Sequence, residues 1–177
     1  VVNKNYYNKS EVLLGDKSLA LFIVGSNYKL DTDFNQNLSL ALDNENINSS
    51  ISFFNYNSVT NYKSFYSANP QWLEKINIQK YLNNYIIGQI KEKQTQNIMD
   101  SEITNVNLKF SGKLVDVKNN KIIPLSSNSE AISYDISQAL DDAYQSLIND
   151  ITDKICYFPL FLYAFNIISS FIKPCRL

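Results

Sequence analysis

Histidine is absent from the 177-residue sequence, and glycine, proline, cysteine, methionine and tryptophan are scarce. The lack of histidine removes the commonest general base and the commonest metal ligand of proteins. The two cysteines, Cys156 and Cys175, cannot form a four-ligand zinc site by themselves. A disulfide between them is possible in an oxidising compartment, but the sequence does not decide it. We therefore expect no metal.

An excess of charge of either sign is missing as well. The formal net charge is −1, so the sequence predicts no basic field that would attract nucleic acid, and it has no acidic tail. Glycine-rich phosphate loops, GxSxG elbows and CxxC pairs are also absent. The turn after residue 24 contains a single glycine, Gly25, whereas a phosphate cradle needs several. We expect neither a cofactor nor a nucleic-acid partner.

Carboxylates are the remaining candidates for chemistry. Asp31 and Asp33 could act as a pair, but helix capping is the simpler interpretation. Asp141 and Asp142 are adjacent on a predicted helix, point about 100° apart and make a poor metal pair. We assign no catalytic residue, although a small enzyme that uses carboxylates and tyrosines stays open as an alternative.

A 177-residue chain can bury roughly 70% of its unfolded surface, enough for one domain with a substantial core. The first clear element is the apolar run at residues 19–24, typical of a strand buried on both faces. Helical spacing predicts a helix over residues 34–42, followed by a second strand over 50–56. Residues 57–70 read as an aromatic loop. Asn69 and Pro70 then suit a helix start, and the spacing from residue 78 to 90 predicts a helix.

The second half gives the strongest fold signal. Residues 102–118 predict a long strand whose apolar parity changes near Gly112, which indicates a bulge or bend. Residues 118–121 form a turn, and residues 122–125 return, with Pro124 indicating a sheet edge or a bulge. Residues 131–134 resume the pairing. A long amphipathic helix follows over 135–155, with Asp135 and Gln138 placed as a capping-box pair.

Three segments follow from this pattern. Residues 1–16 are an irregular lead-in, 17–155 a single domain, and 156–177 an apolar tail. Residues 156–172 are close to the shortest length that spans a membrane. The tail is therefore interpreted as membrane-associated, as packed on the domain, or as an abnormal terminus. No signal-peptide pattern is visible, but the sequence begins at Val1 rather than at methionine, so it is compatible with a processed or truncated form.

The predicted fold class is α+β or an α/β sandwich: a mixed sheet of about five strands with three helices packed on it, and a long C-terminal hairpin followed by a helix. Two groups are candidates for a partner surface. One is the aromatic set Tyr62, Phe65 and Tyr66, for which packing over the sheet is the favoured alternative. The other surrounds the hairpin turn at Asp116, Asn119 and Asn120.

The hairpin also carries a family resemblance. Residues 113–123 read KLVDVKNNKII, between a long strand and a serine-rich strand with a terminal helix. This order resembles the curli assembly/transport (CsgG) family, whose relatives include outer-membrane lipoproteins that activate penicillin-binding proteins. The resemblance covers residues 18–155 as an order of elements. The family's turn usually has glycine where this chain has Asn120, no lipobox cysteine stands near the start, and membrane hairpins are not evident, so pore formation is not expected.

The resemblance implies a non-catalytic protein of the bacterial envelope, periplasmic or associated with the outer membrane. Such a protein would bind other envelope proteins, or copies of itself, and assist assembly or secretion of surface structures. The alternatives are the small carboxylate enzyme and a structural protein anchored by residues 156–172.

Overall fold

The computed structural model describes residues 19–96 and 103–156. Its strands are β1 (Leu19–Val24), β2 (Ser49–Ser50), β3 (Asn84–Gln96), β4 (Thr104–Asp116) and β5 (Lys121–Ser133). Its helices are α2 (Thr32–Asn44), α3 (Tyr56–Val59), α4 (Tyr62–Ser67), α5 (Pro70–Lys75), the 3₁₀ turn η1 (Ile78–Lys80) and α6 (Ile136–Cys156). Residues 1–16 and the tail after Cys156 lie outside the described residues, so the expectations for them stay predictions.

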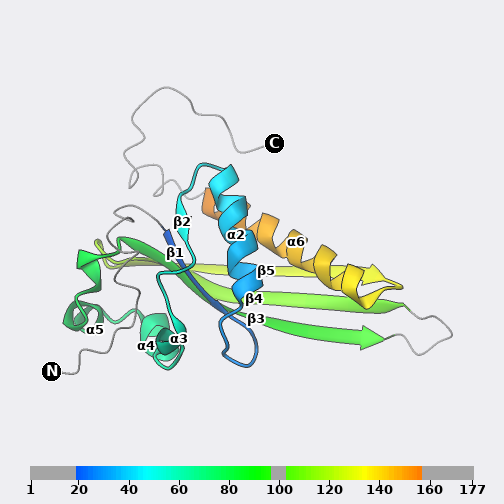
Figure 1. Ribbon diagram of the computed structural model, residues 1–177, viewed down its shortest axis with the longest axis horizontal. Helices are drawn as coiled ribbons and strands as arrows, with labels where there is room; N and C mark the ends of the chain where they lie inside the picture. Colours follow the sequence, from blue (N-terminus) through cyan, green and yellow to red (C-terminus); the bar gives the residue numbers. More distant parts are fainter. Residues whose placement is uncertain (1–18, 97–102, 157–177) are drawn as a thin grey trace.

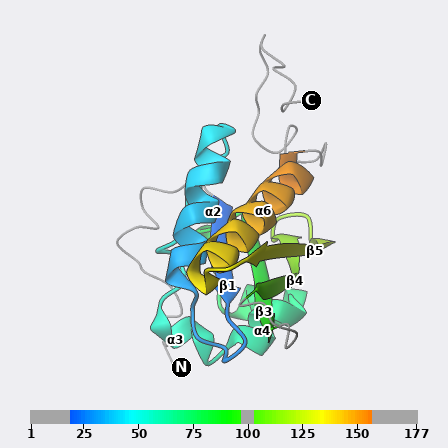
Figure 2. The ribbon, with the colours of Figure 1, turned by 90° about the vertical axis from the view of Figure 1, so that its right-hand side faces the viewer.

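The sheet has the order β2-β1-β3-β4-β5. Strand β1 pairs in parallel with β2 and β3, while β3, β4 and β5 form an antiparallel meander. Helices α2 and α6 cover one face, and the short helices α3 to α5 lie on the other face near β1 (Figures 1 and 2). The predicted mixed five-stranded sheet with helices packed on it is thereby confirmed.

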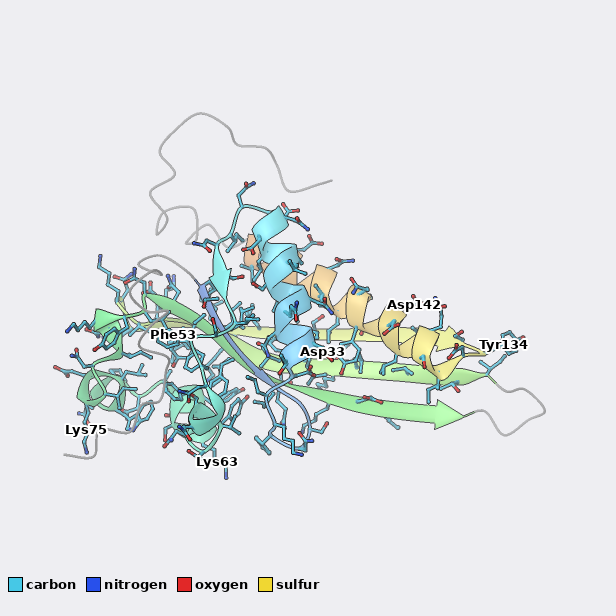
Figure 3. All side chains as sticks on the ribbon, in the orientation of Figure 1. Asp33, Phe53, Lys63, Lys75, Tyr134 and Asp142 are labelled. Carbon is cyan, nitrogen blue, oxygen red and sulfur yellow. The ribbon has the colours of Figure 1, made fainter. Side chains whose placement is uncertain are left out.

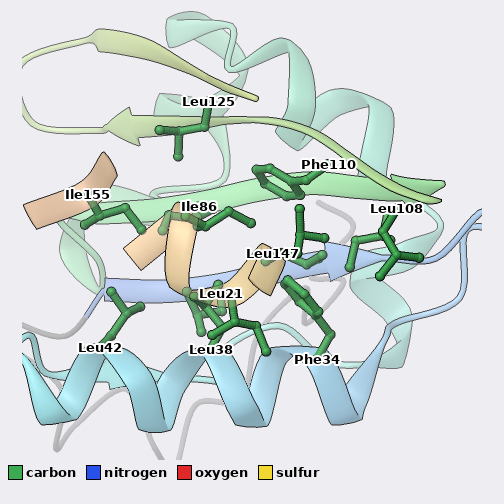
Figure 4. Packing of buried hydrophobic residues seen from close by; sticks show 14 of the residues in the cluster. Leu21, Phe34, Leu38, Leu42, Ile86, Leu108, Phe110, Leu125, Leu147 and Ile155 are labelled. Atoms are coloured by element: carbon green, nitrogen blue, oxygen red, sulfur yellow. The ribbon is translucent and has the colours of Figure 1, made fainter. Parts of the chain in front are cut away.

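The larger core lies between the sheet and helices α2 and α6 (Figure 4). Strand β1 is completely buried because both of its faces are covered, as its unbroken apolar run predicts. Helix α2 begins where the Asp31 carboxylate accepts a hydrogen bond from the Phe34 N–H, 3.1 Å away. Phe34, Leu38 and Leu42 then form its buried stripe, which confirms the predicted helix.

The helix predicted over residues 78–90 is wrong. Only residues 78–80 are helical, and residues 84–96 form the central strand β3. Tyr85, Ile86 and Ile87 are all buried because both sheet faces are covered at this point. A short apolar run does not distinguish a buried strand from a buried helix, and here the misleading periodicity came from joining η1 to the start of β3.

The region after α2 also differs from its prediction. Strand β2 has only two residues, and Phe53 and Phe54 instead pack into the second core on the other face. The predicted loop over 57–70 contains the helical turns α3 and α4, where aromatic side chains cover β1 and β3. The predicted cap at Asn69 is confirmed, since its side chain accepts from the Trp72 N–H at 3.2 Å.

The expected bulge at Gly112 is absent. The β3–β4 register runs without interruption from Asn84 opposite Asp116 to Gln96 opposite Thr104. The parity changes because Val115 and Val117 belong to the second core, under α3 to α5, whereas Leu108 and Phe110 face α6. The sheet is thus covered on both faces at one end and on one face at the other.

Strand β5 is continuous through the serine-rich stretch that separated its two predicted parts. Ser127 and Ser129 are buried under α6, where Ser127 donates to the Asp150 carboxylate and Ser129 donates to the Ala143 carbonyl at 2.7 Å. At the start of α6, Asp135 accepts from the Ser137 N–H as a cap. The predicted capping box is wrong, because the Asp135 N–H donates to Ser133 and Gln138 donates to Asp142.

Candidate functional site

The aromatic group predicted as a partner surface is mostly interior. Phe65 is fully buried and Tyr62 is only 6% exposed. Both rings meet Phe22 edge-on, at centroid distances of 5.8 and 5.5 Å. Tyr66 is half-buried, and the Lys113 ammonium lies 4.2 Å from its ring centroid. Phe65 therefore offers no contact surface, and packing over the sheet accounts for this group.

The second predicted group forms the hairpin turn between β4 and β5. The Asp116 carboxylate accepts hydrogen bonds from the Asn119 N–H at 3.0 Å and from the Asn119 side-chain amide at 2.6 Å. Asn120 adopts a positive φ of 52°, a conformation that asparagine tolerates. Asn119 and Asn120 are exposed, so these residues shape a turn that remains accessible. The two predicted groups thus lie apart, one in α4 and one at the turn, and a role in partner binding stays a prediction.

Strand β5 forms an open edge of the sheet. The Val117 N–H donates to the Asn83 carbonyl at 2.8 Å, which fixes the odd residues of β4 as those bonded to β3. Even residues of β4 are then bonded to odd residues of β5, and the even residues of β5 direct their backbone groups away from the sheet. Pro124 belongs to this outward set, where its missing N–H breaks no bond to β4.

The opposite side of the sheet is closed by a side chain. Strand β2 pairs only with Leu19 and Ala20, which leaves the outer edge of Ile23 without a strand partner. The Asn35 amide of α2 occupies that place: it accepts from the Ile23 N–H at 3.1 Å and donates to the Ile23 carbonyl at 2.8 Å. Among the described residues, therefore, β5 is the long edge that stays open.

A hollow of about 620 Å³ opens beside the N-terminus of α2. Carboxylates of Asp31, Asp33 and Glu92 and the Tyr144 hydroxyl line it, with Lys29 and the turn after β1. The sequence prediction included Asp31 and Asp33 but missed Glu92 and Tyr144. Glu92 was assigned to the solvent end of a helix that does not form, and Tyr144 was read only as part of an apolar stripe.

The hollow disfavours negative charge. Burial raises the pKa of Asp31, and the carboxylates of Asp33 and Glu92 raise it further, against the opposing hydrogen bond from Phe34. Burial, together with Asp31, Glu92 and Asp33, raises the pKa of Tyr144 to about 12. At neutral pH, therefore, the Tyr144 hydroxyl is protonated and can donate a hydrogen bond into the hollow.

Two further results concern the described residues only. Within residues 19–96 and 103–156, no group of three or more cysteine, aspartate and glutamate side chains is arranged to hold a metal ion. Over the same ranges, every helix is too short or too polar to cross a membrane.

Comparison with known proteins connects this chain to others through its fold. No family model matches the sequence, and no curated protein does. A solved structure of a hypothetical protein from Chlamydia trachomatis covers 78% of this chain and 95% of its own length, with 13% identity and a TM-score of 0.52. The shared feature is the fold.

Bacterial lipoproteins are also among the similar solved structures. A minor lipoprotein from Acinetobacter baumannii matches over 78% of this chain and 88% of its own, with 13% identity and a TM-score of 0.42. A lipoprotein from Neisseria meningitidis matches over 77% and 97%, again with 13% identity and a TM-score of 0.42. At these TM-scores the likenesses carry no argument about function, and the resemblance to the curli assembly/transport family stays a prediction.

Proposed function

We propose that this chain is a non-catalytic protein of the bacterial cell envelope that binds other envelope proteins by accepting a strand at the β5 edge. In this role it assists the assembly or secretion of surface structures, in the periplasm or at the outer membrane. The open edge of β5 is the observation that carries the proposal, and the curli-type hairpin in the sequence supports it.

The usable part of the edge lies beyond Pro124. Ser126, Asn128, Glu130 and Ile132 direct backbone N–H and C=O groups outward, so an added strand gains a ladder of main-chain hydrogen bonds there. Each such bond contributes about 0.5–1.5 kcal/mol net. Because Pro124 has no N–H, it discourages pairing on the turn side and directs a partner to the far half of β5.

A proline at position 128 tests this edge directly. Asn128→Pro removes an outward N–H without removing a bond to β4, as Pro124 already does at the same parity. The matched control, Asn128→Ala, keeps the N–H. In cross-linked cells of the native host, we expect envelope-protein adducts to be retained by the alanine variant and lost in the proline variant, with both variants retaining their thermal unfolding transition.

Adducts that persist in the proline variant would exclude strand addition at β5. Cell fractionation tests the compartment separately. A cytosolic native protein without envelope partners would contradict the proposed role as a whole.

The hollow favours a second candidate, a small carboxylate-dependent enzyme. Asp31 has the raised pKa that suits a general acid, and the Tyr144 hydroxyl is protonated beside it. However, the Asp31 carboxylate already caps α2, which ties it to a structural task. Small-molecule binding that shifts the NMR signals of residues 25–33 and Tyr144 would support this candidate, and a screen that leaves those signals unchanged would count against it.

A further inference from the structure

The near-zero net charge conceals a separation of charge between the two sides of the sheet. Helices α2 and α6 carry six aspartates and one lysine, Lys154, which is paired with Asp150. The other side has the opposite sign: Asp33 and Asp142 lie on the helices above the sheet, and Lys63 and Lys75 lie below it (Figure 3). The molecule therefore has an acidic side and a basic side.

The basic side includes a sheet face that no described helix covers. Residues directly opposite in the β3, β4 and β5 ladders share a face, so the covered residues Tyr85 and Val115 identify the face to which Lys91 and Lys109 belong. Beyond α4, the side chains of this face are exposed. They are mainly lysine, asparagine and serine: Lys91, Lys93, Asn107, Lys109, Ser111, Ser126, Asn128 and Glu130.

The lysines are concentrated on this bare face. Lys91 lies directly opposite Lys109, Lys93 follows on the same side of β3, and Lys113 stands at the border with α4. Like charges opposite each other in a ladder repel, so the pair gains from a shared anionic ligand. The one carboxylate of the bare face within the described ranges is Glu130, which accepts a hydrogen bond from the Asn105 amide.

We propose that the bare face, defined by Lys91, Lys93 and Lys109 with its neutral polar neighbours, docks on a lipid bilayer surface that carries anionic headgroups. Three observations favour a bilayer over an acidic protein. The face is an extended stretch of sheet, it has few apolar anchors of the kind protein interfaces bury, and the acidic helices stand on the far side. A negatively charged plane attracts one side and repels the other, which gives a single orientation.

This proposal is independent of strand addition at β5, which uses backbone groups rather than lysine side chains. The test uses the full chain with vesicles of phosphatidylcholine, with and without phosphatidylglycerol. The double variant Lys91→Gln/Lys109→Gln removes two charges from the bare face. The matched control Lys118→Gln/Lys121→Gln removes two charges at the hairpin turn, where Lys118 and Lys121 are exposed.

We expect the bare-face variant to bind phosphatidylglycerol vesicles about thirtyfold more weakly than the wild type, since each lysine at an anionic surface contributes a similar increment. The control should stay close to the wild type, and added salt should weaken wild-type binding. Circular dichroism spectra of both variants establish that they are folded.

Three outcomes would overturn the proposal: equal losses in the two variants, no loss in the bare-face variant, or wild-type binding that does not depend on phosphatidylglycerol. Competition provides a fourth. If soluble polyglutamate or a short single-stranded DNA displaced the protein from vesicles at equal charge concentration, the face would be a site for acidic proteins or nucleic acid and not a bilayer surface.

Discussion

Two glycines face each other at the centre of the β3–β4 ladder, and the ring of Phe110 occupies the space beside them. Gly88 is paired with Gly112 in the continuous register. A Cβ at either position would meet the tip of the Phe110 ring, and a Cβ at Gly112 would also lie 2.5 Å from the Ile87 carbonyl oxygen. The two positions thus differ in whether the obstacle is a side chain or backbone.

This difference predicts two distinct mutational results. Gly88→Ala and Gly112→Ala should each lower the free energy of unfolding by about 1–3 kcal/mol, the usual cost of overpacking. Repeating both in a Phe110→Leu background should largely remove the cost at Gly88, whose main obstacle is the ring, but not at Gly112. Urea denaturation measures all five variants. Equal rescue at both positions would contradict the role given to the Ile87 carbonyl.

At Asp31, a raised pKa makes stability depend on pH. The folded state holds the carboxyl proton more tightly than the unfolded state, whose pKa is near 3.8. The contribution of Asp31 is therefore fully present below pH 3.8 and is lost as pH rises through the raised folded pKa. An asparagine at this position would still cap α2, since asparagine caps helices as well as aspartate does.

We therefore expect Asp31→Asn to be more stable than the wild type at neutral pH and equal to it near pH 3. Thermal unfolding across this range measures the difference. A variant that is less stable than the wild type at pH 7 would show that the hydrogen bond to Phe34 outweighs the burial of the charge.

At the scale of elements, one side chain closes a sheet edge. The Asn35 amide bonds both backbone groups of Ile23 and also donates to the Asp31 carbonyl at 2.6 Å, all in a position that is 2% exposed. Asn35→Ala should cost about 1–3 kcal/mol, because the buried Ile23 groups lose their partner. Asn37→Ala, an exposed change on the same helix, is the control. Hydrogen exchange at the Ile23 amide should accelerate in the first variant only.

The sequence predicted those elements whose pattern reflects one environment. The apolar run of β1, the stripe of α2 and the long stripe of α6 were recognised because each keeps the same surroundings along its length. Strand β3 was missed because it passes from two-sided burial at Ile87 to an exposed face at Lys91. The same transition made β4 look bulged at Gly112. Neither change is local, since it depends on where α3 to α5 end.

For the whole molecule, the open β5 edge was predictable and the charge pattern was not. Pro124 and the hairpin indicated an edge strand from sequence alone. The bare lysine face requires the registers of three strands, and one of these was taken for a helix. A net charge of −1 describes the sum of two sides and conceals the field of each.

The pairing of β1 with β3 has a consequence for the order of folding. Leu19 is paired with Asn84, and everything from α2 to η1 lies between them in the chain. Closing so long a loop is entropically costly, whereas β4, β5 and α6 meet through short connections. We expect the meander and α6 to form first as a template, with β1 docking late and completing the double-sided core.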